Sequence, residues 1–506
     1  FNKQNKIPFK NKNIQYEYNL LLLSIINEKS LYHSSFNLNI LKKIALIHIV
    51  KKQKKNLYLN ISNINLSELT QLKSFFKKRK IKYKFTNINF DFFKFFKNKF
   101  ILLFQAFSYL LYYFIKNFYF IFDTKYKFSI KKYDVLIQNY FTQINIKKNN
   151  LTSDQWGFFL DKIKQKKRKI FFLHFQIYDN KNTKKINDSL KKANTQLISH
   201  FFLNNLLNLS VFKNVLYSYF SIFFRSFKHV NSKNDYEFLV NLDFSKYLKI
   251  SLYGKKSIFN LFYIFLFDRF SKTNFTFKNA FYIQEFQSWE YIFNKSLSKN
   301  ISNLSIGYQH AFSRYWDLRY TMNFDHIKKL NFLNYYPNYY LVTGPPDFLN
   351  MKKNLFETQD VIAVETTRFF NFFFINKKKI TKNKLNKIII FGDYNTYMNK
   401  IFLKDFKNNH KLFKRFKTYY KSHPSINEYI NDPMLLIIDK KTSVFDILND
   451  FDFSIIIGAS TISFHCIYFK VKTIIYTPIN DLNYNPSRNF KYVTNINSLR
   501  QINFNK

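Results

Sequence analysis

The sequence predicts an α/β fold divided into two domains, and three observations predict it. The chain has 506 residues, which is too long for one ordinary hydrophobic core. Its hydrophobic content of 46% is enough to fill a core in each half. Beyond residue 337, short apolar segments alternate with amphipathic ones, a pattern typical of a doubly wound parallel sheet. We therefore expect an N-terminal domain over residues 1–335 and a C-terminal domain over residues 336–506.

The C-terminal half has the clearest pattern of secondary structure. Its apolar runs are short, as expected of strands buried on both faces, and amphipathic segments lie between them. Strands are predicted at residues 340–343, 361–364, 387–391, 417–421, 435–438, 453–457 and 473–476. Helices are predicted at residues 396–408, 443–449 and 460–470. All of these elements are assigned to the C-terminal domain.

The N-terminal half mixes helical and strand signals, which also indicates an α/β layer. Helices are predicted at residues 31–52 and 67–80 and around Trp156, and strands at 56–61, 133–137 and 169–173. The longest apolar run, residues 100–115, ends at Lys116 and is shorter than the roughly 18 residues that span a bilayer. It predicts a buried or interfacial helix, and the aromatic, basic segment 210–229 predicts a second surface-seeking helix.

The chain is strongly basic, with 81 Lys and Arg against 31 Asp and Glu and a formal charge of +50. Such a charge ordinarily favours nucleic acid or an anionic membrane as a partner. Only ten of the basic residues are Arg, whereas a phosphate-reading surface would use the bidentate guanidinium more often. Because Lys, Asn, Phe, Ile and Tyr share AT-rich codons, we attribute most of the charge to the base composition of the gene. Nucleic acid is therefore not expected as a partner.

Cys466 is the single cysteine of the sequence. It excludes an internal disulfide framework and any cysteine-based zinc cluster. A lone thiol fits a reducing compartment, and no signal-peptide pattern is visible. We therefore expect a cytoplasmic protein.

The first segment suited to chemistry is residues 418–425, where a predicted strand leads into Lys421, His423 and Pro424. Ligands of open α/β sheets bind at the carboxyl ends of the strands, where His423 is expected. A histidine there can donate a hydrogen bond or a positive charge to a phosphate oxygen. The same dipeptide is also compatible with an ordinary turn.

The second segment is an apolar strand that breaks at Gly458 and continues into Ser460 and Thr461. These two hydroxyls are expected to cap a helix that runs to about Lys470. Unpaired amides at a helix N-terminus, together with two hydroxyls, can hold a phosphate, although an ordinary helix cap has the same sequence.

The third segment, residues 307–319, combines His310, Arg314, Asp317 and Arg319 with a tryptophan. Glycine, tryptophan and arginine are rare in this chain, and this concentration exceeds what a core strand requires. The two arginines are candidate donor-binding residues. His310 and Asp317 are candidate catalytic residues.

A glutamate follows a short apolar strand just upstream of this segment. Glu285 is positioned to act as a general base toward a sugar hydroxyl, with Asp317 and His310 as competitors and a solvated strand end as the structural alternative. Glu290 is expected to face solvent. The Asp450–Asp452 pair precedes a strand, at the sheet end away from the expected site, so no metal site is predicted.

Taken together, these segments resemble a family of bacterial surface-carbohydrate biosynthesis proteins. The resemblance is to O-antigen and capsule glycosyltransferases, and it covers about residues 130–490. It is carried by Glu285 and Trp289, residues 307–319, Lys421 to Pro424, and Ser460–Thr461. The resemblance implies a GT-B fold, two Rossmann-like domains facing a cleft, and transfer of sugar from a nucleotide-sugar to a lipid-linked saccharide acceptor at the inner-membrane surface. The His-Pro and Ser-Thr elements are also similar to those with which bacterial sialyltransferases hold a CMP-sugar, but the Asp-Gly base motif of those enzymes is not found.

On that resemblance His423, Ser460 and Thr461 would bind donor phosphate and Glu285 would be the base of an inverting, metal-independent transfer. No cofactor besides the nucleotide-sugar substrate is expected. Two alternatives remain: a nucleotide-sugar epimerase or polyol-phosphate transferase on the same fold, and a non-catalytic basic protein that binds membrane or nucleic acid.

Overall fold

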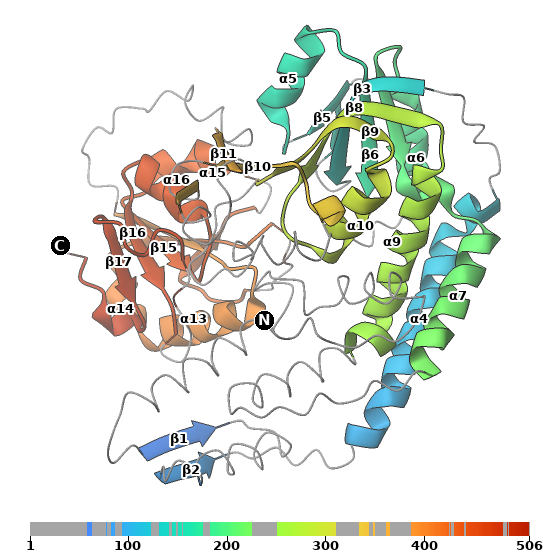
Figure 1. Cartoon of the computed structure of the whole chain (residues 1–506). Helices are drawn as coiled ribbons and strands as arrows, with labels where there is room; N and C mark the ends of the chain where they lie inside the picture. The colour runs from blue at the N-terminus through green and yellow to red at the C-terminus, as the bar shows by residue number, and fades with distance from the viewer. Residues whose placement is uncertain are drawn as a thin grey trace. The chain divides into compact units, whose positions relative to one another are not determined.

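The computed structural model describes residues 58–62, 77, 82–86, 94–122, 131–140, 144–147, 150–153, 155–175, 183–224, 250–309, 333–343, 348–349, 361–364, 386–424, 426, 430–439, 442–478, 483 and 485–504. These residues form two compact α/β units (Figure 1). Unit 1 comprises residues 1–310 and 318–368, and unit 2 comprises residues 311–317 and 369–506.

Unit 1 is built on a seven-stranded parallel sheet in the order β11-β10-β9-β8-β3-β6-β7. The strands are β3 (Lys131–Tyr140), β6 (Ile170–Phe175), β7 (Ile198–Phe202), β8 (Phe275–Ile283), β9 (Ile301–Tyr308), β10 (Tyr339–Thr343) and β11 (Val361–Val364). Counted along the chain, their order is 7-6-5-4-1-2-3, the Rossmann order with one added edge strand. Successive strands are therefore added on one side of β3 up to β7, and on the other side of β3 from β8 onward.

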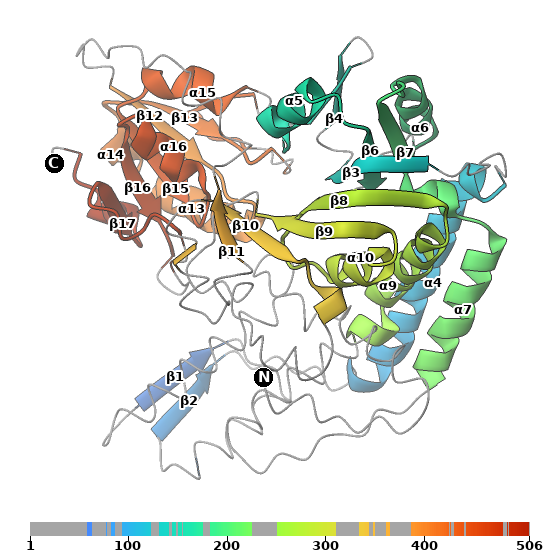
Figure 2. The ribbon, with the colours of Figure 1, turned by 45° about the horizontal axis from the view of Figure 1, so that its top comes forward.

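Each helix of unit 1 contributes buried apolar side chains to the core that it shares with this sheet. They are α4 (Lys94–Phe122), α5 (Gly157–Gln165), α6 (Thr183–Lys192), α7 (Leu209–Phe224), α9 (Lys255–Ser271) and α10 (Ser288–Leu297). Helix α9 contacts α4, α7 and α10 (Figure 2). Two small pairs lie outside the main sheet: β1 (Tyr58–Ser62) with β2 (Lys82–Thr86), and β4 (Ile144–Lys147) with β5 (Asn150–Ser153).

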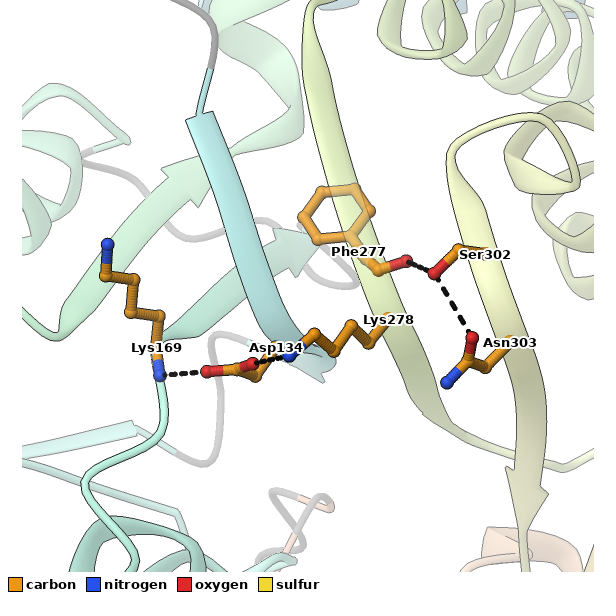
Figure 3. A network of polar contacts seen from close by, with 6 residues as sticks. All are labelled: Asp134, Lys169, Phe277, Lys278, Ser302 and Asn303. Atoms are coloured by element: carbon orange, nitrogen blue, oxygen red, sulfur yellow. Dashed lines mark hydrogen bonds and ion pairs between the residues drawn. The ribbon is translucent and has the colours of Figure 1, made fainter.

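A polar network joins the strands of unit 1 near their N-terminal ends (Figure 3). The carboxylate of Asp134 on β3 accepts the backbone N–H of Lys169, before β6, at 3.0 Å and lies 2.8 Å from the ammonium of Lys278 on β8. The hydroxyl of Ser302 on β9 donates to the carbonyl of Phe277 on β8 at 3.4 Å. Asp134 thus ties three neighbouring strands together at the edge opposite their carboxyl ends.

Replacing Asp134 with asparagine is expected to lower the free energy of unfolding of unit 1 by about 1 to 2 kcal/mol at neutral pH. The Lys278 ammonium, and then the Lys169 N–H, lower the pKa of Asp134. A depressed carboxyl pKa stabilises the fold above the unfolded value of about 3.9, and this contribution disappears as the pH falls through the folded pKa. Urea unfolding should therefore separate wild type from Asp134→Asn at neutral pH and bring them together in acid; an equal gap at both pH values would contradict this account.

Unit 2 is a six-stranded parallel sheet in the order β14-β13-β12-β15-β16-β17. The strands are β12 (Lys387–Phe391), β13 (Lys417–Lys421), β14 (Leu435–Ile437), β15 (Phe453–Ile457), β16 (Lys472–Tyr476) and β17 (Val493–Ile496). The helices are α13 (Thr396–Asn408), α14 (His410–Phe413), α15 (Val444–Ile447) and α16 (Ile462–Tyr468). Counted along the chain the order is 3-2-1-4-5-6, the strand order of a dinucleotide-binding sheet.

The predicted fold class of two Rossmann-like α/β domains is confirmed by the two sheets. Every strand predicted beyond residue 337 is present within one residue of its expected bounds, and the structure adds β17. The predicted boundary after residue 335 does not match the strand pairing. β10 pairs with β9, and β11 with β10, so both belong to the sheet of unit 1. The facing of the two domains across a cleft stays a prediction.

The apolar run that Lys116 interrupts in the sequence is part of a longer helix of unit 1. Helix α4 extends from Lys94 to Phe122, beyond both ends of that run. Among the described residues, Phe100–Phe122 is the one stretch long and apolar enough, by length and composition, to cross a membrane. One face of this helix belongs to the core of unit 1, where Ala106, Leu110 and Phe120 are buried.

Candidate active site

Two glycines mark the carboxyl edge of the unit 2 sheet where the strand order reverses. Gly392 follows β12 and Gly458 follows β15. A Cβ on Gly392 would lie 2.5 Å from the hydroxyl of Tyr420, and a Cβ on Gly458 would overlap the carboxylate of Asp393. Gly458 also has φ +67°, a conformation that other residues rarely adopt. Gly458 therefore requires glycine, and a larger residue at Gly392 would displace the Tyr420 hydroxyl; both turns lie at the point where such sheets bind ligands.

Asp393 links the two turns. It is buried, and its Oδ2 accepts the backbone N–H of Ala459 at 3.0 Å. This hydrogen bond connects the turn after β12 with the turn after β15. Its Oδ1 accepts the N–H of Asn395 at 2.7 Å, and its own N–H donates to the side-chain carbonyl of Asn399 at 2.7 Å. Asp393 therefore fixes the turn that begins α13 relative to the turn after β15.

Asn485 supports the same turn from the other side. Its amide nitrogen donates to the carbonyl of Gly458 at 2.9 Å, and its carbonyl accepts the hydroxyls of Ser463 at 3.2 Å and Ser487 at 2.9 Å. All three side chains are buried. The backbone at residues 458–460 is thus held in one conformation by contacts that sequence reasoning did not identify.

Ser460 and Thr461 lie where the sequence placed them, but the helix that follows is shorter than expected. Helix α16 ends at Tyr468 and not near Lys470, because Lys470 adopts φ +58°. The hydroxyl of Ser460 accepts the N–H of Ile462 at 3.4 Å, and the side chain of Thr461, the residue before the helix, makes no capping hydrogen bond. Both side chains are half-buried.

The three candidates after β13 have different environments. Lys421 is buried, its ammonium donates to the backbone carbonyl of Asp439 at 3.0 Å, and burial lowers its pKa. His423 is half-buried, and its ring meets the ring of Tyr394 edge to face at a centroid distance of 5.4 Å. Pro424 is exposed. Lys421 therefore supports the loop after β14, whereas His423 and Tyr394 lie together beyond the ends of the neighbouring strands β12 and β13.

In unit 1, Glu285 lies just beyond β8, beside the point where that sheet also reverses its strand order. Its side chain is half-buried, and its Oε2 accepts a hydrogen bond from the amide of Gln287. Strands β3 and β8 are joined here through Gln138, whose side-chain carbonyl accepts the N–H of Ile283 at 3.1 Å. Glu285 is thus held at the carboxyl edge of the sheet.

Glu290 was expected to face solvent, and this prediction is wrong. Its side chain is buried, and the residue is only 1% exposed. Its carboxylate accepts the backbone N–H groups of Glu285 at 2.8 Å, Phe286 at 3.0 Å and Gln287 at 3.0 Å, as well as the amide of Gln284. With Gln287 it forms a capping box at the start of α10. Burial raises its pKa well above the ordinary value, and the N–H donors oppose that shift. Glu290 shapes the loop that carries Glu285.

Tyr140, at the end of β3, completes the surroundings of Glu285. Its ring is buried and meets Trp289 edge to face. Burial, followed by the charges of Glu285 and Glu290, raises the pKa of the phenol well above its usual value. Gly307 has a structural role beside this cluster, because a Cβ there would overlap the side-chain carbonyl of Gln284.

The remaining candidates lie outside the described residues. They are His310, Arg314, Asp317 and Arg319. Asp452 accepts the N–H of Lys387 at 3.2 Å, which places it at the amino edge of the unit 2 sheet, as the sequence predicted. Within the part of the chain that the structure describes, no group of three or more His, Cys, Asp or Glu residues could hold a metal ion.

No protein-family model and no curated protein matches this sequence. Among solved structures the chain is similar to the glycotransferase of kitacinnamycin, at 6% identity and a TM-score of 0.38 over 74% of this chain and 88% of that one. It is also similar to OtsA in its apo form, at 9% identity and a TM-score of 0.38 over 71% of this chain and 87% of that one. At this distance the functional argument depends on the chain's own residues.

Proposed function

We propose that this chain is a glycosyltransferase of the GT-B type that transfers a sugar from a nucleotide-sugar to a lipid-linked saccharide acceptor in the cytoplasm. The observation that supports it most is the pair of glycine turns, Gly392 and Gly458, that Asp393 joins where the unit 2 sheet reverses its strand order. Nucleotides bind at this point of such sheets, in the crevice beyond the carboxyl ends of the strands. The surface-polysaccharide setting rests on the sequence resemblance.

The donor nucleotide is assigned to unit 2. His423 and the hydroxyls of Ser460 and Thr461 would donate hydrogen bonds to the phosphate that leaves with the nucleotide. The half-exposed ring of Tyr394, held against His423, is suited to contact with a sugar or base face. Lys421 stays a candidate for the same phosphate, since its ammonium donates one hydrogen bond to the Asp439 carbonyl and has two further N–H groups.

The base is assigned to unit 1. Glu285 would accept the proton of the acceptor hydroxyl while that oxygen forms a bond to the anomeric carbon and the bond from that carbon to the phosphate oxygen breaks. Attack opposite the leaving group inverts the anomeric centre. The negative charge then stays on the nucleotide phosphate, which His423 and the hydroxyls stabilise without a metal ion.

Dinucleotide chemistry is disfavoured by the glycine positions. The chain has six glycines, and no two of them are close enough to form the G-x-G-x-x-G fingerprint that holds a pyrophosphate. A Rossmann strand order without that fingerprint favours a nucleotide-sugar substrate over a nicotinamide or flavin cofactor.

Replacing His423 with alanine is expected to weaken nucleotide binding by about 1.5 to 3 kcal/mol, or roughly 10- to 150-fold, because a charge-assisted hydrogen bond is lost. Calorimetric titration with CMP, UDP and GDP would measure the effect and identify the preferred nucleotide. His410→Ala is the matched control: this histidine of unit 2 pairs with Asp432 at 3.1 Å and precedes β13, at the other edge of the sheet.

Unchanged nucleotide affinity in His423→Ala would remove this residue from the donor site. Turnover of the nucleotide-sugar without any acceptor would instead favour the epimerase. Binding of nucleic acid that is lost with salt and indifferent to His423 would favour a non-catalytic basic protein.

A further inference from the structure

We propose that α4 and α7 of unit 1 together form a docking surface for an anionic lipid bilayer, on which both helices lie flat. This inference does not depend on sugar transfer. The outer face, as we call it, consists of large apolar side chains on one stripe of each helix: Phe100, Phe104, Phe107, Leu111, Ile115, Phe118 and Phe122 on α4, and Leu209, Tyr217, Phe220 and Phe224 on α7.

The spacing of these residues makes the outer face continuous. On α4 they recur every three or four positions, so they line one side of the helix over about 33 Å. Phe107 on α4 packs against Phe220 on α7 at a ring-centroid distance of 5.7 Å, which joins the two stripes. The two helices lie side by side in both views of the unit (Figures 1 and 2).

The outer face is exposed to a degree that is unusual for such side chains. Phe104 is 73% exposed and Tyr217 is 78% exposed. Contiguous apolar patches of this kind on a folded protein mark an interaction site. The opposite side of each helix is already occupied, since Leu110 and Phe120 on α4 and Val215 on α7 belong to the core of unit 1.

That buried side argues against a spanning helix. Asn117, on the core side of α4, accepts a hydrogen bond from the amide of Asn204 at 2.8 Å and donates to the carbonyl of Tyr113 at 2.8 Å. A helix that crossed the bilayer would have to leave these partners and the core. A helix with one side in the protein and the other side apolar fits the interface between headgroups and acyl chains.

The charges around the outer face identify lipid as the occupant. Lys116 on α4 lies over Tyr112, and Lys184 on α6 lies over the ring of Tyr119 on α4, at 4.8 Å. Lys213 lies on the α7 stripe itself and is exposed. Lysines beside and within an apolar face complement anionic headgroups above acyl chains. A second copy of this chain would bring the same lysines and the same formal charge of +50 against them.

The test is co-sedimentation of the full chain with vesicles of phosphatidylcholine alone and of equal parts phosphatidylcholine and phosphatidylglycerol. We expect clear binding to the mixed vesicles, weak binding to the neutral ones, and release by high salt. A variant with Phe104→Ser, Leu111→Ser and Ile115→Ser should bind the mixed vesicles about 100-fold more weakly, because three apolar insertions are lost.

A second variant tests the charges without touching the apolar residues. Lys116→Gln, Lys184→Gln and Lys213→Gln together should weaken binding to mixed vesicles by at least about tenfold and leave the weak binding to neutral vesicles unchanged. The matched control is Tyr492→Ser, which removes a side chain that is 76% exposed but lies in unit 2, and should change binding by no more than about twofold.

Three results would overturn the proposal. The first is wild-type vesicle binding by both triple variants. The second is membrane association that resists salt and alkali and yields only to detergent, which would assign α4 to a bilayer-spanning position. The third is a dimer that the apolar variant abolishes in a chain that does not bind vesicles, which would assign the outer face to a second copy.

Discussion

Replacing Glu285 with glutamine is expected to lower kcat by about 10²- to 10⁴-fold and leave nucleotide affinity nearly unchanged, the pattern for loss of a general base. Glutamine keeps the size of the side chain and an oxygen that can accept from Gln287, so the loop should keep its conformation. What is lost is the ability to take a proton from the acceptor hydroxyl. Steady-state kinetics with saturating donor, together with calorimetric nucleotide binding, separates the two effects.

The control for this variant is a carboxylate of unit 1 that has no place in the proposed chemistry. Asp268 on α9 is exposed and pairs with Lys272, the residue just after that helix, so Asp268→Asn should leave kcat unchanged. His310→Ala and Asp317→Asn test the competing assignments. If Glu285→Gln keeps most of its activity and one of those variants loses it, the role of base passes to that residue.

Replacing Glu290 with alanine is expected to destabilise unit 1 by about 3 kcal/mol or more, because four donors lose a buried acceptor at once. Three of these donors are consecutive backbone N–H groups of the turn that carries Glu285, so kcat should fall as the turn loses its shape. Glu290→Gln retains one acceptor oxygen and should cost roughly half as much. Thermal and urea unfolding measure both effects.

The two glutamates are distinguished by which quantity changes. Glu285→Gln should alter turnover at constant stability, whereas Glu290→Ala should alter stability first. A Glu290→Ala protein with the unfolding midpoint of the wild type would show that the capping box contributes little to stability.

The strands of unit 2 could be predicted from sequence because buried parallel strands are short, uninterrupted apolar runs. Residues 387–391 and 453–457 show this plainly. The domain boundary could not be predicted in the same way. β10 and β11 have the same local pattern as β12, and only long-range pairing with β9 assigns them to unit 1.

The candidate site was predictable in its strand ends but not in its supports. Gly458 and His423 follow apolar strands, which is a local signal. Asp393 has the same kind of signal, a Gly-Asp pair directly after a strand, and could have been found. Asn485 could not, because it lies in a loop and reaches Gly458 from 27 residues away.

The burial of Glu290 also left a trace in the sequence. Gln287 and Glu290 have the spacing of a capping box at the start of an apolar helical segment. The motif usually begins with serine or threonine, and the glutamine at its first position obscured it. The partner of Lys421 was not predictable for a different reason, because it is a backbone carbonyl, which no side-chain pattern reveals.

The shared strand order has a consequence for synthesis on the ribosome. In the main sheet of each unit the first strand made becomes an inner strand, and one of its edges has no partner until the fourth strand of that sheet appears. About 135 residues separate the end of β3 at Tyr140 from the start of β8 at Phe275, against about 62 between β12 and β15. At about 5 to 20 residues per second, the free edge of β3 persists for roughly 7 to 27 s, about twice as long as that of β12. Because an unpaired, apolar strand edge is a template for aggregation, the nascent chain needs chaperone protection most while residues 141–274 emerge.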